Sequence, residues 1–138
     1  REKQLGDKHL LVASTLINLG DIHLRNMNVD ASLDSYNQAL RIRALQLGSQ
    51  DTEVAFVLGK IGNAYAENGE HTRAVEYYFD AAKVREHDGG KESLNYALSV
   101  EEITISQIEL GKYDDAMKCL RHVLNVKILK LGGKHDEV

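Results

Sequence analysis

The residues that most often carry chemistry are scattered along this sequence. No two of the six histidines stand four positions apart, so one helix face cannot offer the paired imidazoles that would hold a metal ion. Cys119 is the only cysteine, and without a CxxC partner it is better suited to a buried position than to nucleophilic attack. The adjacent Glu101 and Glu102 would point in different directions on a helix, which makes a poor acid–base pair. The segment Gly132-Gly133-Lys134 is too short for a phosphate-binding loop. We therefore expect no enzymatic activity, no metal site and no cofactor.

One spacing dominates the sequence instead, because glycines and apolar residues recur every 42 positions. The glycines of this series are Gly6, Gly48, Gly90 and Gly132. Five further series keep the same phase and start at Arg1, Val12, Ala13, Leu16 and Leu19. A period of this size is typical of stacked repeat units, which share a face for binding a partner and seldom hold a catalytic centre.

The composition agrees with a helical array. Of the 138 residues, 43% are hydrophobic and 28% are charged, which is typical of globular proteins, and no apolar run is long enough for membrane insertion. The absence of proline lets helices run without a break. The net charge of −4 argues against a nucleic-acid binder, which needs a basic face. One cysteine and no signal-peptide pattern favour a cytoplasmic location.

Apolar spacing and turn residues predict two helices in each unit. In the first unit, one helix is expected over residues 8–26 and a second is expected to be capped by Asp30 and to end at Gly48. In the second unit, Asp51 or Thr52 is expected to cap a helix that ends near Asn68-Gly69. The second helix of that unit is expected over residues 70–87.

The third unit is expected to start after Gly90, to break at Gly111 and to end near Gly132. The chain then forms one array with repeats at residues 8–48, 49–90 and 91–132. Residues 1–7 and 133–138 are expected to be partial flanking repeats, which indicates a part of a larger chain or complex.

The second unit resembles the tetratricopeptide repeat (TPR). In that pattern, small residues let the two helices approach closely, and large residues fill the space beside them. The matching positions are Gly62, Tyr65, Gly69, Ala74, Tyr78 and Ala81, with Leu16, Leu19, Gly20, Tyr36 and Ala39 in the first unit. The resemblance implies an all-α, right-handed superhelix, or solenoid, of antiparallel helix pairs. WD40 repeats have a similar period, but this chain has no tryptophan for their Trp-Asp signature.

Ordinary TPR units have 34 residues, so each unit here carries eight more. The junction at residues 1–6, with His9 and Val12-Ala13, resembles those of kinesin light chain and nephrocystin-type TPR arrays. The His-Pro-Asp-Val-Ala junction usual in kinesin light chains lacks its proline here.

The TPR resemblance implies that the first helix of each unit lines a concave groove for partner proteins. The residues expected to bind a partner there are Asn18, Asp21, Arg25, Phe56, Lys60, Asn63, Glu67 and Glu101. The amide side chains in this set can donate to and accept from a peptide backbone, and Phe56 is suited to an apolar anchor contact. The same residues also suit an ordinary solvated helix surface.

Kinesin light chain grooves, which this groove resembles, bind tryptophan-acidic peptides through basic and amide residues. Here only Arg25 and Lys60 supply positive charge, and Glu101 opposes an acidic ligand. We predict a protein–protein interaction scaffold or adaptor that binds a peptide or a partner helix. Two alternatives remain, a structural spacer or assembly subunit in a larger complex and the regulatory arm of a multidomain signalling protein.

Overall fold

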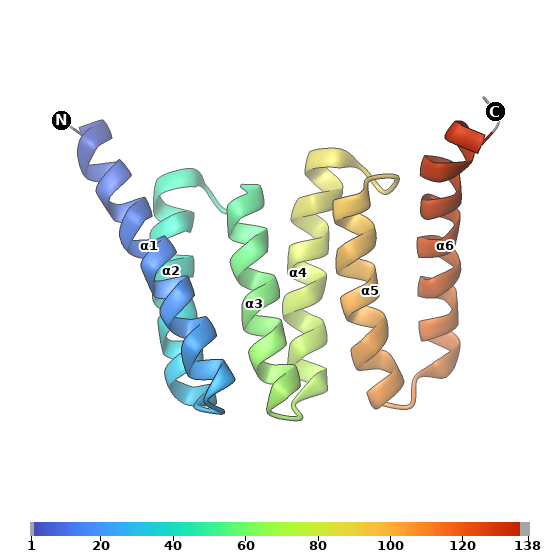
Figure 1. Cartoon of the computed structure of the whole chain (residues 1–138), viewed down its shortest axis with the longest axis horizontal. Coiled ribbons are helices and arrows are strands. Elements are labelled where there is room, and N and C mark those ends of the chain that lie inside the picture. Colours follow the sequence, from blue (N-terminus) through green and yellow to red (C-terminus); the bar gives the residue numbers. More distant parts are fainter. Residues whose placement is uncertain (1, 136–138) are drawn as a thin grey trace.

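The computed structural model describes residues 2–135 and contains six α-helices in that range. Their bounds are α1 Glu2–Arg25, α2 Val29–Leu47, α3 Thr52–Glu67, α4 His71–Gly89, α5 Leu94–Glu109 and α6 Tyr113–His135. Each helix packs against the next one along the chain, and consecutive helices run in opposite directions (Figure 1). The predicted all-α solenoid of antiparallel helix pairs is confirmed. Within residues 2–135, no helix combines the length and the apolar character needed to cross a membrane.

Glycines follow the ends of two helices, at the predicted position for α2 and two residues beyond the predicted end at residue 87 for α4. α2 stops at Leu47 and α4 at Gly89, and the next residues, Gly48 and Gly90, have φ angles of 92° and 79°. Side chains other than glycine are strained at such angles. The predicted cap at Asp51 is also confirmed, because its carboxylate accepts a hydrogen bond of 2.9 Å from the Glu53 amide.

Two predicted helix limits and one predicted cap were wrong. α1 begins at Glu2 instead of near residue 8, and α6 continues past Gly132 to His135. Asp30 lies in the first turn of α2, while Asn28 occupies the cap position and accepts no hydrogen bond with its side chain. The division into three repeats with partial flanking repeats stays a prediction, and residues 1 and 136–138 lie outside the described range.

Helices within a unit approach closely where a glycine faces a tyrosine. Gly62 of α3 lies so close to the buried ring of Tyr78 in α4 that an added Cβ would be 2.6 Å from its Cε1. Gly20 and Tyr36 form the same contact between α1 and α2. The predicted close packing of small and large residues is therefore present in the first two units.

Apolar clusters join each unit to the one that follows. In the first cluster, Tyr36 and Ala39 of α2 pack with Val57 and Ile61 of α3. A second cluster brings Tyr78 and Ala82 of α4 together with Ile103 of α5. The array therefore has a core that continues across its unit boundaries, as stacked repeats require.

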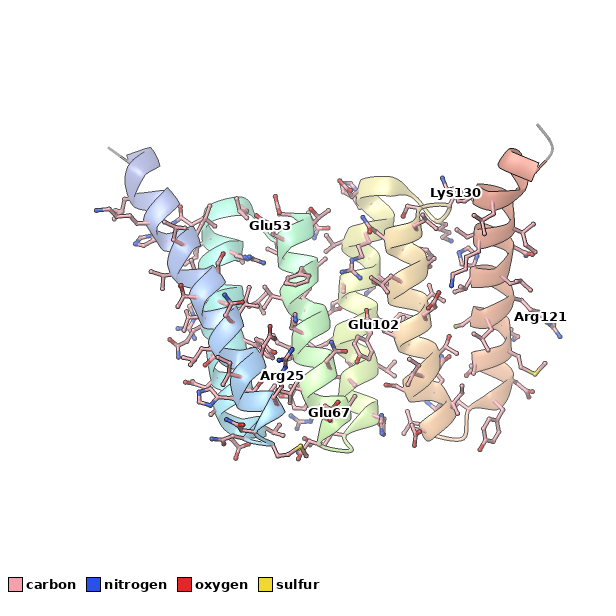
Figure 2. The ribbon with its side chains drawn as sticks, in the orientation of Figure 1. Arg25, Glu53, Glu67, Glu102, Arg121 and Lys130 are labelled. Carbon is pink, nitrogen blue, oxygen red and sulfur yellow. The ribbon has the colours of Figure 1, made fainter. Side chains whose placement is uncertain are left out.

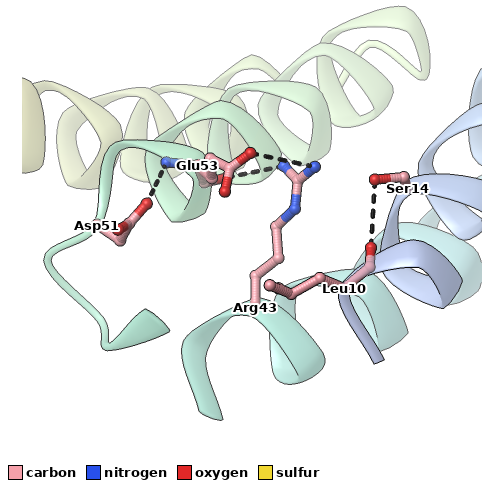
Figure 3. A network of polar contacts seen from close by, with 5 residues as sticks. All are labelled: Leu10, Ser14, Arg43, Asp51 and Glu53. Atoms are coloured by element: carbon pink, nitrogen blue, oxygen red, sulfur yellow. Dashed lines mark hydrogen bonds and ion pairs between the residues drawn. The ribbon is translucent and has the colours of Figure 1, made fainter. Parts of the chain in front are cut away.

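A polar contact accompanies the first of these boundaries (Figure 3). Arg43 of α2 is buried, and its guanidinium donates to the carbonyl oxygen of Glu53 at 3.1 Å and lies 4.0 Å from the carboxylate of the same residue. Arg85 holds the corresponding place one repeat later, where it donates to Ser99 at 2.6 Å and lies 3.8 Å from the Glu102 carboxylate. Each arginine thus links its unit to the next.

Candidate functional site

The site predicted by register corresponds to a pocket that opens between α1 and α3. It has a volume of about 320 Å³, and we call it the groove pocket. Its lining residues are Asp21, Leu24, Arg25, Met27, Tyr36, Lys60, Asn63 and Glu67. Five of the eight predicted binding residues, Asp21, Arg25, Lys60, Asn63 and Glu67, are thereby brought together by two helices from neighbouring units.

The floor of the groove pocket is held by an ion pair between the two units. The ammonium of Lys60 lies 3.1 Å and 3.3 Å from the two carboxylate oxygens of Asp21. The hydroxyl of Tyr36 donates to the same carboxylate. Burial, followed by this hydrogen bond, raises the pKa of Tyr36 well above its ordinary value, so the tyrosine stays protonated and remains a donor. Asp21 therefore already balances the charge of Lys60.

Asn63 takes part in a similar contact one repeat later. Its side-chain oxygen accepts a hydrogen bond of 2.6 Å from the hydroxyl of Tyr78. Burial raises the pKa of Tyr78, which keeps that hydroxyl protonated. Because an amide has two N–H donors besides its oxygen, Asn63 can still donate hydrogen bonds into the pocket.

The rim of the groove pocket carries two opposite charges. Arg25 is the last residue of α1 and Glu67 the last of α3, and both are exposed at the same end of the molecule (Figure 2). Among the described residues, neither side chain has a hydrogen bond or ion pair. The apolar side chains of Leu24 and Met27 lie beside them in the lining. The rim can therefore contact a cation, an anion and an apolar group of a ligand.

The other three predicted residues lie outside the groove pocket. Phe56 is half-exposed on α3, and the Lys60 ammonium lies 5.2 Å from its ring centroid, so it extends the same face along the helix. Asn18 is exposed on α1. Glu101 lies elsewhere, because its carboxylate pairs with Lys127 of α6 at 2.7 Å in a different groove.

Sequence reasoning did not name Leu24, Met27 and Tyr36 as lining residues. Tyr36 belongs to the second helix of its unit and reaches the pocket through its hydroxyl. The sequence prediction considered only residues of the first helices, so it did not include Tyr36. Met27 lies in the turn after α1 with φ 61°. Over residues 2–135, we find no group of three or more metal-ligating side chains.

Comparison with known proteins identifies the family. The model for the tetratricopeptide repeat matches residues 11–87, which is more than half of the chain. The chain therefore belongs to the tetratricopeptide repeat family. No curated protein sequence matches it.

Solved structures show the same fold at low sequence identity. BtubC (BKLC) from P. vanneervenii superimposes with a TM-score of 0.76 at 19% identity, covering 84% of this chain and 46% of that one. The nearly identical TPR-like repeats from Podosopora anserina, described as those of a kinesin light chain, give 0.75 at 19% identity, covering 86% and 56%. The TPR domain of Arabidopsis FLU gives 0.72 at 18%, covering 87% and 95%. The chain thus spans about half the length of the first two structures and resembles kinesin light chain-like repeats in fold.

Proposed function

We propose that this chain is a scaffold or adaptor module that binds a peptide or a helix of a partner protein in the groove pocket. Its TPR fold is that of a protein–protein interaction module, and proteins of this family are typically non-enzymatic scaffolds. The observation that carries the proposal is the convergence of five register-predicted polar residues on one pocket between α1 and α3.

The charges of the groove pocket favour a ligand of mixed charge. Lys60 is balanced by Asp21, so an acidic ligand would have to displace an existing ion pair before it could use that ammonium. Arg25 and Glu67 are exposed and can pair with an acidic and a basic ligand residue, respectively. An apolar ligand side chain between them would contact Leu24 and Met27. We therefore propose a segment with an apolar residue flanked by opposite charges.

A library of displayed random peptides, selected on the purified chain, tests this proposal. We expect selected peptides to combine an apolar residue with one acidic and one basic residue. Arg25→Ala and Glu67→Ala should each weaken their binding about 2- to 5-fold, because each removes one charge contact of about 1 kcal/mol or less at an exposed site. Affinity is measured by calorimetric titration of a selected peptide.

Arg41→Ala is the matched control, since Arg41 is an exposed arginine of α2 outside the pocket lining. It should leave peptide affinity unchanged. All three variants replace exposed side chains, so their thermal unfolding should match that of the parent chain. A library that yields no binder, or binders with equal affinity for all variants, would contradict the proposed groove.

A cytoplasmic location and protein partners, with no nucleic-acid ligand, complete the proposal. The single cysteine supports the cytoplasmic location, and the net charge of −4 supports a protein partner over a nucleic acid.

A further inference from the structure

Two apolar surfaces, one on the first helix and one on the last helix pair of the described residues, are exposed, whereas most of the equivalent positions of the other units are buried. The α1 face consists of Val12, Thr15, Leu19 and Ile22 on the outer side of α1, and all four are exposed. The α5–α6 face consists of Ile105, Ile108, Leu120, Leu124 and Lys127 at the opposite end, and they line a groove of about 470 Å³. Contiguous apolar surfaces that stay exposed on a folded chain often mark sites of interaction with another protein.

The repeat period shows what the α1 face is suited to contact. Leu19 is 42% exposed, whereas the residues one and two periods later, Ile61 and Ile103, are 0% and 2% exposed. Ile61 is buried against the first unit and Ile103 against the second. Val12 follows the same rule, since it is exposed while Val54 is buried. The equivalent side chains of α3 and α5 therefore pack on a preceding unit. The α1 face is suited to the same kind of contact.

The α5–α6 face has the complementary relation. Leu120 is 46% exposed, whereas its equivalents Tyr36 and Tyr78 are 0% and 4% exposed. Leu124 is 57% exposed, and its equivalent Ala82 is buried where α5 covers α4. In the first two units, the surface equivalent to the α5–α6 face is thus the one on which the first helix of the next unit packs.

A polar contact supports the same pairing. Arg43 and Arg85 each reach into the first helix of the next unit, and Lys127 is the next member of their series. Within the described range, Lys127 pairs only with Glu101 of its own unit. In α1, Thr15 and Asn18 occupy the positions of the two residues that Arg85 contacts in α5, Ser99 and Glu102. Both offer an oxygen that could accept a hydrogen bond from Lys127.

We propose that a second copy of this chain docks its α1 face on the α5–α6 face, in the geometry by which α3 packs on the first unit and α5 on the second. The occupant is a second copy because its own α1 carries the apolar and polar side chains that the interior contacts use. The contact is head-to-tail, so each copy keeps one free face and longer assemblies can form. This self-association goes beyond partner binding in the groove pocket.

Complementary variants test the proposal by sedimentation velocity. The parent chain should show an average mass that rises with concentration. Leu19→Glu damages only the α1 face and Leu124→Glu only the α5–α6 face, so each alone should remain a monomer. Their equimolar mixture should form a 1:1 dimer and nothing larger, because one intact face remains on each partner.

Leu45→Glu is the matched control, since Leu45 is 78% exposed on α2 outside both faces, and it should associate like the parent chain. Circular dichroism checks that each variant keeps its helicity. If Leu124→Glu loses helicity, Ile105→Glu replaces it, because Ile105 is 62% exposed. A parent chain that stays monomeric at every concentration would overturn the proposal. So would a mixture of the two variants that forms no 1:1 dimer. A variant that dimerises alone would also overturn it, which is the result expected for pairing through identical faces.

Discussion

Replacing Gly62 by alanine is expected to lower the free energy of unfolding by about 2 kcal/mol, because the added methyl group would overpack a helix crossing. A Cβ at this position would lie 2.6 Å and 2.8 Å from two ring carbons of Tyr78. The ring is buried and its hydroxyl is bonded to Asn63, so it cannot move away without loss of that hydrogen bond. The two helices must therefore separate or the ring must leave its position.

Gly59→Ala provides the control within the same helix. Gly59 is also buried in α3, but a Cβ there meets only the Glu102 carboxylate, at 3.8 Å and 3.9 Å, which is ordinary contact. Since alanine favours a helix over glycine, this variant should gain about 0.5–1 kcal/mol. Urea unfolding followed by circular dichroism measures both changes. A similar effect for the two variants would show that the close contact with Tyr78 carries little energy.

The third unit suggests how the Gly62 variant can be rescued. Its equivalents of Gly62 and Tyr78 are Thr104 and Leu120, so a larger residue on the first helix occurs with a smaller one on the second. In a double-mutant cycle, Gly62→Ala should cost less in a Tyr78→Leu background than in the parent chain. Additive losses would place the cause elsewhere than in this contact.

The helix stops show where sequence reasoning succeeded and where it failed. Gly48 and Gly90 end helices and Gly132 does not, although the period makes them equivalent. A glycine inside a helix costs only about 1 kcal/mol, which is too little to stop a helix alone. Three residues after the two effective glycines stand Asp51 and Ser93, whose side chains cap the next helix.

The corresponding residues after Gly6 and Gly132 are His9 and His135, which are not preferred caps. The glycine and the cap together define a break, so reading both series would have predicted the continuous α1 and α6. The predicted cap at Asp30 was wrong because α2 already begins at Val29, which places Asp30 inside the helix.

The groove residues were predictable to the extent that they depend on repeat register. Asp21 and Asn63 are equivalent, as are Arg25 and Glu67, and the structure brings all four to one pocket. The ion pair between Asp21 and Lys60 was not predictable, because it depends on how α3 is placed against α1.

The placement of Glu101 could have been corrected from its own series. Its equivalents are Ile17 and Gly59, which are both buried. A position that is buried in both preceding units is covered by the helices packed on it, so it faces away from the groove pocket. Glu101 accordingly lies toward α6 and pairs with Lys127.

Arg85→Met is expected to lower the free energy of unfolding by about 2 kcal/mol at neutral pH, since it leaves the Glu102 carboxylate largely buried without its cation. The side chains of Arg85 and Glu102 are only 11% and 22% exposed. Burial raises the pKa of Glu102 above its ordinary value, and the charge of Arg85 partly offsets this rise. Loss of the arginine should therefore raise that pKa further and make ionisation in the folded state more costly.

The pH dependence separates this cause from simple loss of packing. An acid whose pKa is raised by folding destabilises the folded state only when it is ionised, so the cost is full above the raised pKa. The cost should disappear as the pH falls below the ordinary value of 4.5. Urea unfolding at a series of pH values should therefore show the deficit of Arg85→Met shrinking on acidification. The lost hydrogen bond to Ser99 should leave a remainder that does not depend on pH.

Arg43→Met is the matched control one repeat earlier. Its ionic partner Glu53 is 57% exposed, so water can solvate the carboxylate when the arginine is removed. The loss should be about 1 kcal/mol, from the hydrogen bond to the Glu53 carbonyl, and should not change with acid. Adding Glu102→Gln to Arg85→Met should recover the pH-dependent part of the loss at neutral pH, because the uncompensated charge is then gone. Equal and pH-independent losses in the two arginine variants would show that burial of Glu102 does not set the cost.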